Sequence, residues 1–143
     1  MIFKIMNAED KDLLFKDLCG RLPYGVKIKE EYGDYIDVNI HNANIEHLID
    51  RVVSGLDKLV LRPMYSMTEE EKKEFIEYAG YEIEESLNGR HYEYYLKDFC
   101  GTPNNPSGNA DSVDWLNKNM FDYRGLIPKS LALEAKEGMY KND

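Results

Sequence analysis

The chain has 143 residues, which is the usual size of one domain. Its 27 acidic and 18 basic residues give a formal net charge of −9. A surface of that sign repels phosphate, so direct binding to nucleic acid is not expected. Hydrophobic residues make up 43% of the chain and charged residues 31%, which excludes a disordered chain and indicates a folded protein with a charged exterior.

The cysteines and the lengths of the apolar runs indicate the cellular compartment of the protein. Cys19 and Cys100 are the two cysteines, and two thiols without a paired framework are typical of reduced intracellular proteins. The opening residues MIFKIMNAED reach acidic side chains too early for a secretory signal. No apolar run approaches the roughly 18 residues of a membrane span. We therefore expect a cytoplasmic protein that makes no membrane contact.

Residues 7–22 predict the first helix. Asn7 suits the N-cap position, and acidic residues follow it at the positive end of the helix dipole. Leucines recur at intervals of four, so the helix has one buried stripe, and Gly20 is expected to end it. The residues expected on the stripe are Leu14, Phe15, Leu18, Cys19 and Leu22.

Residues 26–40 change to a period of two. Apolar residues alternate with polar ones on both sides of the turn EEYGD, which is the pattern of a β-hairpin. Each strand should bury one face and expose the other. The residues expected on the buried face are Val26, Ile28, Ile36, Val38 and Ile40.

A short helix and a single strand follow the hairpin. Residues 44–55 suit a helix that ends at Gly55. The segment KLVLRP predicts a strand over residues 59–61. Pro63 should stop this strand, because proline cannot donate to a β-ladder.

The stretch SMTEEEKKEFIEYAG predicts a surface helix. Ser66 with Glu69, and Thr68 with Glu71, both have the spacing of a capping box. Gly80 is expected to end the helix.

The next segments predict a second hairpin, a loop and a last helix. Residues 81–97 alternate around Asn88-Gly89, a dipeptide typical of a type I′ turn. Residues 101–111 are rich in Gly, Pro, Asn and Ser, which indicates a loop within the domain. A short helix then begins with Asp111 or Ser112 as its cap. The residues expected on its inner face are Val113, Leu116 and Met120.

Together these patterns predict one α+β domain over residues 1–143. We expect a small, mostly antiparallel sheet built from the two hairpins and the strand at 59–61, packed with three or four helices. The stretch MFDYRGLIPKSLALEA, residues 120–135, is expected to close the core, with Phe121 buried in it. Docking of a partner on this stretch remains an open alternative.

No catalytic constellation is evident in the sequence. His41, His47 and His91 do not have zinc-site spacing. There is no glycine-rich phosphate loop and no G-x-S-x-G motif. With 27 carboxylates, close pairs are expected by chance. We therefore predict no catalytic residue, no metal site and no cofactor.

Trp115, Tyr123 and Arg124 are the candidates for binding a ligand or a partner. Arg124 could stack on the Tyr123 ring, pair with a carboxylate, or hold an anionic ligand. A structural anchor is the favoured role, and the ligand-binding role stays open. Trp115 is expected to pack, with its N–H donating to a carbonyl. The chain also has 11 tyrosines, some concentrated in MYSM and HYEYY, and tyrosine suits both sheet faces and interfaces.

Three segments carry a resemblance: LCGRLPYGV, LRPMYSMTEEEK and WLNKNMFDYRGLIPKSLALEA. In this order they resemble a group of small uncharacterised proteins from Bacteroides-type bacteria, their phages and mobile elements. The resemblance implies no established activity. Members often carry two histidines where this chain has Asn119 and Met120, so such a pair has no role here. Glycine is common at the position of Ser130, and a serine there argues against a required positive φ.

These observations favour a non-enzymatic accessory protein of a phage or mobile element that acts by binding a host or phage protein. The alternative is a small-ligand binder or enzyme with a pocket lined by Tyr123 and Arg124. A third hypothesis is an acidic mimic of DNA, which requires carboxylates spaced like phosphates along one face.

Overall fold

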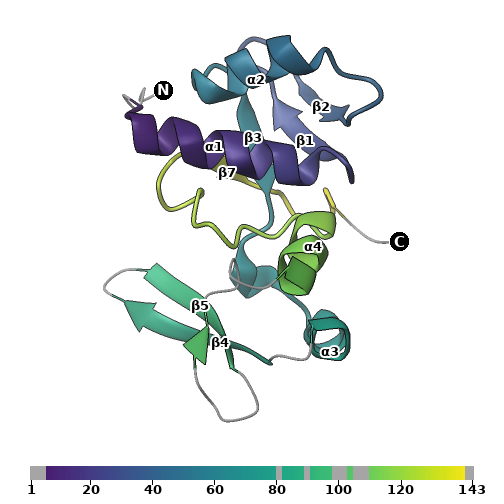
Figure 1. Cartoon of the computed structure of the whole chain (residues 1–143), viewed down its shortest axis with the longest axis vertical. Coiled ribbons are helices and arrows are strands. Elements are labelled where there is room, and N and C mark those ends of the chain that lie inside the picture. Colours follow the sequence, from purple (N-terminus) through teal and green to yellow (C-terminus); the bar gives the residue numbers. More distant parts are fainter. Residues whose placement is uncertain (1–5, 80–81, 89–90, 98–102, 105–109, 141–143) are drawn as a thin grey trace.

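The computed structural model describes residues 6–79, 82–88, 91–97, 103–104 and 110–140. Figure 1 shows the first sheet with α1 and α2 at one end of the molecule, and α3 with the second hairpin at the other. The α+β class is confirmed. The elements are α1 (Ala8–Arg21), β1 (Val26–Lys29), β2 (Tyr35–Val38), α2 (Ile45–Val53), β3 (Lys58–Leu61), the 3₁₀ helix η1 (Met64–Ser66), α3 (Glu69–Ala79), β4 (Glu82–Asn88), β5 (His91–Lys97), β6 (Pro103–Asn104), α4 (Ala110–Lys118) and β7 (Ala132–Glu134).

The first sheet has the strand order β2-β1-β3-β7. The predicted hairpin is confirmed, because β1 and β2 pair antiparallel with Val26 opposite Val38. β1 also pairs antiparallel with β3, and the unexpected strand β7 adds to β3 in parallel. β7 has only three residues, which is too short for its alternation to be recognised in the sequence.

The second hairpin does not join this sheet, so the predicted single sheet is wrong on this point. β4 and β5 form a separate three-stranded sheet with β6. Asn88 pairs with His91, and the turn between them lies outside the described residues. The predicted loop 101–111 is also corrected, because β6 lies within it and α4 already begins at Ala110. The remainder of that loop lies outside the described residues, as does Cys100.

The first helix has the predicted cap. The Asn7 side chain accepts from the Asp10 backbone at 2.8 Å, and the Asp10 carboxylate accepts from the Asn7 backbone at 3.5 Å. The predicted stripe is only partly right, because Phe15 and Cys19 are exposed. The helix presents a charged edge to the core in their place, as described below.

The helix also continues past Gly20 to Arg21, so glycine does not end it. A Cβ at Gly20 would lie 3.0 Å from Asn117 Nδ2. The glycine therefore lets α4 approach α1 closely.

Two further expectations about local structure are corrected. Of the three apolar residues expected to be buried after the turn, only Val38 is, and Ile36 and Ile40 are exposed. Ile36 lies on β2, the edge strand of the sheet, and Ile40 lies in a turn beyond the end of that strand. Asp111 and Ser112 lie inside α4, which begins at Ala110, so neither is the N-cap.

The Thr68 capping box before α3 is confirmed, with hydrogen bonds of 3.1 Å in both directions between Thr68 and Glu71. Ser66 does not cap this helix. It ends η1, and its hydroxyl donates to the backbone oxygen of Pro63 at 2.6 Å.

The buried side chains form two clusters. One lies between the first sheet and the helices α1 and α2, and the other lies between η1, α3 and α4. The stretch 120–135 contributes to both clusters: Met120 and Leu126 to the first, and Phe121 to the second. The prediction that this stretch closes the core with Phe121 buried is confirmed.

The same stretch contains two strained backbone positions. Met120 has φ 63° and Ser130 has φ 61°, values in the left-handed region that non-glycine residues rarely adopt. The expectation that Ser130 does not require a positive φ is therefore wrong. The serine keeps the conformation despite its Cβ.

Candidate functional site

Trp115 lies in the second cluster. Its ring makes an edge contact with Phe75, with centroids 5.2 Å apart, and stacks on Phe121 at 5.8 Å. The indole N–H donates to Glu74 Oε1 at 3.1 Å, so its acceptor is a carboxylate and not the predicted carbonyl. Trp115 is buried, and the described contacts give it a packing role.

Arg124 and Tyr123 contact one another and the first helix. Arg124 Nε lies 3.2 Å from Asp17 Oδ1, and the Arg124 guanidinium carbon lies 5.0 Å from the centroid of the Tyr123 ring. The Tyr123 hydroxyl donates to Asn117 Oδ1 at 2.9 Å. The Arg124 side chain is only 19% exposed. This geometry agrees with the anchor role of Arg124.

Asp17 holds a second guanidinium, that of Arg21. Arg21 donates to the two carboxylate oxygens of Asp17 at 2.8 and 3.1 Å, and from Nη2 to the backbone oxygen of Phe121 at 2.6 Å. Both side chains are fully buried. Burial disfavours the cation and is the largest single influence on the pKa of Arg21, but the charge and hydrogen bonds of Asp17, together with nearby Tyr123 and Asp122, raise that pKa overall.

Asp122 completes this charged cluster. Its two carboxylate oxygens accept from the backbone N–H groups of Leu126 at 2.8 Å and Ile127 at 2.9 Å. Burial raises the pKa of Asp122, although these two hydrogen bonds act in the opposite direction. Two carboxylates therefore balance two guanidinium groups, and the cluster fastens α1 to the 120–135 stretch.

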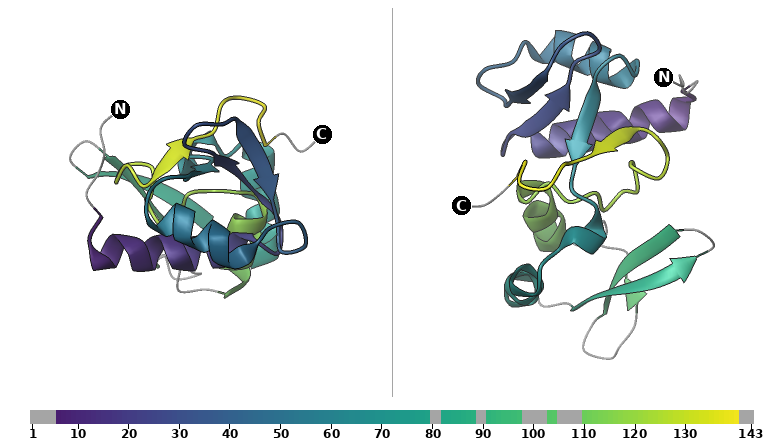
Figure 2. Two further views of the ribbon diagram at one scale, coloured as in Figure 1. Left: turned by 90° about the horizontal axis from the view of Figure 1, so that it is seen from above. Right: turned by 180° about the vertical axis from the view of Figure 1, so that it is seen from behind.

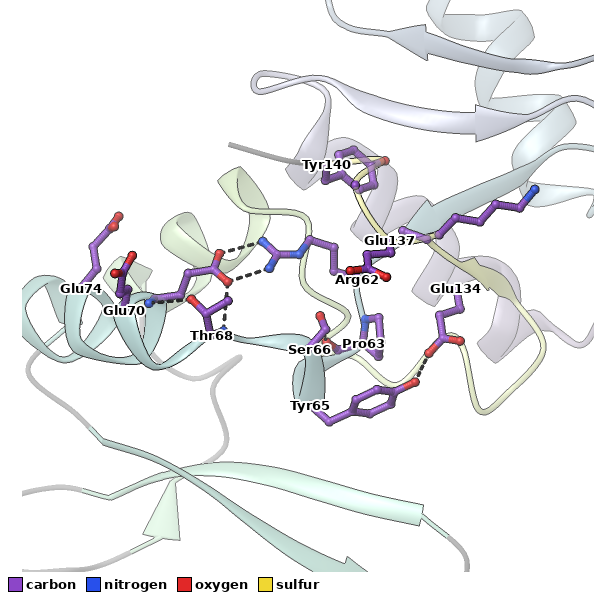
Figure 3. Close-up of a pocket in the computed structure, with 14 residues that line it drawn as sticks. Arg62, Pro63, Tyr65, Ser66, Thr68, Glu70, Glu74, Glu134, Glu137 and Tyr140 are labelled. Carbon is purple, nitrogen blue, oxygen red and sulfur yellow. Dashed lines mark hydrogen bonds and ion pairs between the residues drawn. The ribbon is translucent and has the colours of Figure 1, made fainter. Parts of the chain in front are cut away.

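A different part of the molecule has a hollow of about 710 Å³. Figure 3 shows it between α3 on one side and the segment 134–140 on the other. We call it the acidic groove. Its lining residues are Arg62, Pro63, Tyr65, Ser66, Thr68, Glu70, Glu71, Glu74, Glu134, Ala135, Lys136, Glu137, Gly138 and Tyr140.

The charges of the groove are unequal, with five glutamates against one arginine and one lysine. Glu71 neutralises Arg62 through two hydrogen bonds of 2.7 and 2.8 Å. Glu134 accepts from the Tyr65 hydroxyl. Glu70 and Glu137 form no hydrogen bond or ion pair between their side chains and other described residues, so their charges face the groove without a counterion.

Two lining groups have shifted pKa values. Burial of Glu71 acts to raise its pKa, but the hydrogen bonds from Arg62 and Thr68 prevail and lower it. The hydrogen bond to Glu134 raises the pKa of Tyr65, so its hydroxyl stays protonated at neutral pH. The shift of Glu71 favours its ionised carboxylate, and the shift of Tyr65 favours its neutral hydroxyl.

The lining of the groove contains no histidine and no cysteine. Within the described parts of the chain, no group of three or more potential metal ligands comes together. The arrangement of carboxylates can attract and hold a cation or a basic surface.

Sequence reasoning missed the groove. Its walls come from residues 62–74 and 134–140, which are far apart along the chain, and Glu71 was assigned only a capping role. The one sequence feature that indicated this region is the tyrosine of the segment MYSM, which is Tyr65 and lines the groove. Two smaller hollows, of about 550 and 380 Å³, lie elsewhere. Trp115, Tyr123 and Arg124 line none of these three hollows.

The fold and site define an acidic α+β protein with a charged groove. No helix among the described residues has the length and apolar character needed to cross a membrane. In comparisons with known proteins, no family model, no curated protein and no solved structure matches the chain.

Proposed function

We propose that the protein acts by binding another protein, and that the acidic groove holds a basic segment of that partner. The observation that carries this proposal is the groove itself, about 710 Å³ in volume and lined by five glutamates. Its volume lies within the range of small-molecule pockets, about 300–1,000 Å³, but such pockets are lined mainly by apolar side chains. The excess of glutamates in the lining therefore favours a basic protein segment as the ligand.

Aromatic residues support a docking role. Tyr65 is 62% exposed and lies in the groove, where Figure 3 shows its hydroxyl directed to Glu134. A tyrosine with a large accessible ring and a fixed hydroxyl is a common anchor of protein interfaces. The carboxylates around it would select a lysine- or arginine-rich partner and speed its approach.

The cellular setting is part of the same proposal. The resemblance of three segments to proteins of phages and mobile elements supports an accessory role in such an element. The two cysteines without a paired framework support a cytoplasmic location. An accessory protein of this kind would work by occupying a host or phage protein.

The proposal is tested by affinity capture from nuclease-treated lysate of a Bacteroides-type host. The wild type is compared with a groove variant, Glu70→Lys with Glu137→Lys, and with the control Glu46→Lys, which changes an exposed glutamate on α2. We expect one stoichiometric partner that the groove variant loses and the control retains. The purified partner should then bind the groove variant at least about tenfold more weakly, since two attractive charges become repulsive. Equal capture by all three proteins, or no partner for any of them, would refute the proposal.

A further inference from the structure

The first sheet has one face without a helix. In β1, Val26 and Ile28 point into the core beneath α1 and α2, so Lys27 and Lys29 point the other way. The right-hand view of Figure 2 shows this second face of the sheet, and no helix of the described chain lies over it. We call it the lysine face. The pairing register adds Tyr35, Asp37, Lys58 and Leu133 to it. Val60 lies on the same side of the sheet but is fully buried, so it offers no contact surface.

The lysine face is positive on a chain whose net charge is −9. Among its register positions Asp37 is the one carboxylate, and it pairs with Lys27 at 2.7 Å. Lys29 donates to the backbone oxygens of Glu30 and Gly33, which orient the ammonium group without cancelling its charge. Lys136 adds another positive charge, because its Nζ lies 5.5 Å from the centroid of the Tyr35 ring.

The lysine face and the acidic groove adjoin one another. Lys136 and Tyr140 line the groove, and both also contact residues of the lysine face. The Tyr140 hydroxyl accepts from the Lys27 backbone N–H and donates to the Val60 backbone oxygen, each at 2.6 Å. Two surfaces of opposite charge therefore meet along the segment 136–140.

We propose that two copies of the chain associate about a two-fold axis, with the lysine face of each copy against the acidic groove of the other. Adjacent patches of opposite charge are self-complementary under a two-fold rotation, because each patch then meets its opposite. The shared residues Lys136 and Tyr140 would lie close to the axis. The inference rests on the groove as the docking surface proposed above, so a second copy and a basic partner compete for it.

The character of the two surfaces suits such a dimer. Tyr35 is 38% exposed on one surface and Tyr65 is 62% exposed on the other, so each contributes an aromatic ring. A second copy is favoured over an unrelated acidic protein because this chain itself carries the complementary charge.

The test is a charge exchange between the two surfaces, read by light scattering during size-exclusion chromatography. The face variant is Lys27→Glu with Lys29→Glu, neither of which lines the groove, and the groove variant is Glu70→Lys with Glu137→Lys. Each variant alone places like charges against one another and should be monomeric. In an equimolar mixture both contacts become attractive again, so a dimer with one copy of each variant should form. The control Glu46→Lys should behave as the wild type.

Salt provides a second readout. Between about 0.1 M and about 1 M NaCl the Debye length falls from about 10 to about 3 Å, so the wild-type dimer should dissociate. A monomeric wild type at low salt, variants that remain dimeric, or a mixture that stays monomeric would each overturn the dimer.

Circular dichroism checks folding of each double variant. Where one is unfolded, Lys29→Glu or Glu70→Lys alone should weaken the dimer at least about tenfold.

A labelled oligolysine peptide separates this inference from the proposed function. The face variant keeps the acidic groove, so it should bind the peptide at least as well as the wild type, because no second copy competes. A monomeric wild type that binds the peptide through the groove would overturn the dimer and leave the groove as a docking site. The opposite result is also informative. If the two variants dimerise only when mixed and the face variant does not bind the peptide, the result supports the proposed dimer and counts against a basic partner.

Discussion

Asp17 on α1 and Arg124 near the end of the chain form an ion pair with 3.2 Å between carboxylate oxygen and guanidinium nitrogen. The same carboxylate binds Arg21, whose guanidinium reaches the backbone oxygen of Phe121. One buried carboxylate therefore links the first helix to the stretch that closes the core. Buried charges are tolerated only when they are paired, so this linkage depends on Asp17.

We expect Asp17→Asn to lower the free energy of unfolding by about 3–5 kcal/mol, because it leaves two guanidinium groups without their shared counterion. Chemical denaturation measures the loss. Asp12→Asn is the matched control, since Asp12 pairs with Lys16 on the exposed side of the same helix and should cost less than about 1 kcal/mol. Similar losses of unfolding free energy for the two variants would show that Asp17 stabilises the fold no more than an exposed aspartate does.

Phe121→Ala should lower the free energy of unfolding by about 3–5 kcal/mol. Phe121 is fully buried, stacks on Trp115 and lies 4.1 Å from the Arg62 guanidinium carbon, so its removal leaves a cavity in the second cluster. The control is Phe15→Ala on the exposed side of α1, for which a change near 0.5 kcal/mol is expected. A change that small for Phe121 itself would mean that the stretch does not close the core.

Tyr140→Phe should cost about 1–3 kcal/mol, which is the penalty for leaving buried partners without a hydrogen bond. Its hydroxyl bridges the backbones of β1 and β3 at Lys27 and Val60, and phenylalanine keeps the ring while removing the bridge. Thermal and denaturant unfolding measure the effect. Tyr32→Phe is the control, because Tyr32 is almost fully exposed; a neutral result at Tyr140 would argue against the bridge.

The Arg62–Glu71 pair should make stability fall in acid. The pKa of Glu71 is lowered in the folded state, so its contribution is fully present above the unfolded pKa of about 4.3 and is lost as the pH falls through the folded pKa. Glu71→Gln keeps a capping-box side chain and removes the charge. At pH 7 it should cost on the order of 1–3 kcal/mol.

The measurement for Glu71 is the unfolding free energy of both proteins from neutral pH to about pH 3. The difference between wild type and Glu71→Gln should shrink as the pH falls below the unfolded pKa of glutamate, about 4.3. A difference that stays constant across this range would show that the ionised carboxylate is not the source of the stability.

Ser130→Gly should stabilise the protein by about 0.5–1 kcal/mol. Ser130 is exposed and has φ 61°. Glycine removes the steric cost of the left-handed conformation, of about 1–2 kcal/mol, and part of this gain is offset by greater freedom of the unfolded chain. Ser130→Ala keeps the Cβ and is the control that should show no gain. Equal midpoints of thermal unfolding for the glycine and alanine variants would contradict the argument.

Local patterns predicted most elements correctly. The capping box of Thr68 and Glu71 and the alternation of Val26 and Ile28 depend on residues a few positions apart, so the local sequence contains the necessary information. The same reasoning failed at Cys19 and Phe15, because a helical stripe of apolar residues does not reveal that the adjacent edge carries a buried ion pair. Arg124, which pairs with Asp17 on that edge of α1, lies near the other end of the chain.

Among the candidates Trp115, Tyr123 and Arg124, Trp115 packs as expected, and Arg124 makes two of the contacts considered for it, with the Tyr123 ring and with a carboxylate. Their partners, Glu74, Asn117 and Asp17, could not be chosen from the sequence, because many carboxylates and amides were equally available. The acidic groove and the lysine face were missed for the same reason, since each gathers side chains from distant segments.

The sequence by itself determined the α+β class, the N-caps of α1 and α3, the first hairpin and the negative charge, since these depend on composition and short-range spacing. The tertiary structure decided which charges are buried, which sheet the second hairpin joins and where surfaces of opposite sign meet. Those outcomes depend on which distant segments pack together, and packing is set by the complementarity of whole faces, which a local pattern does not contain.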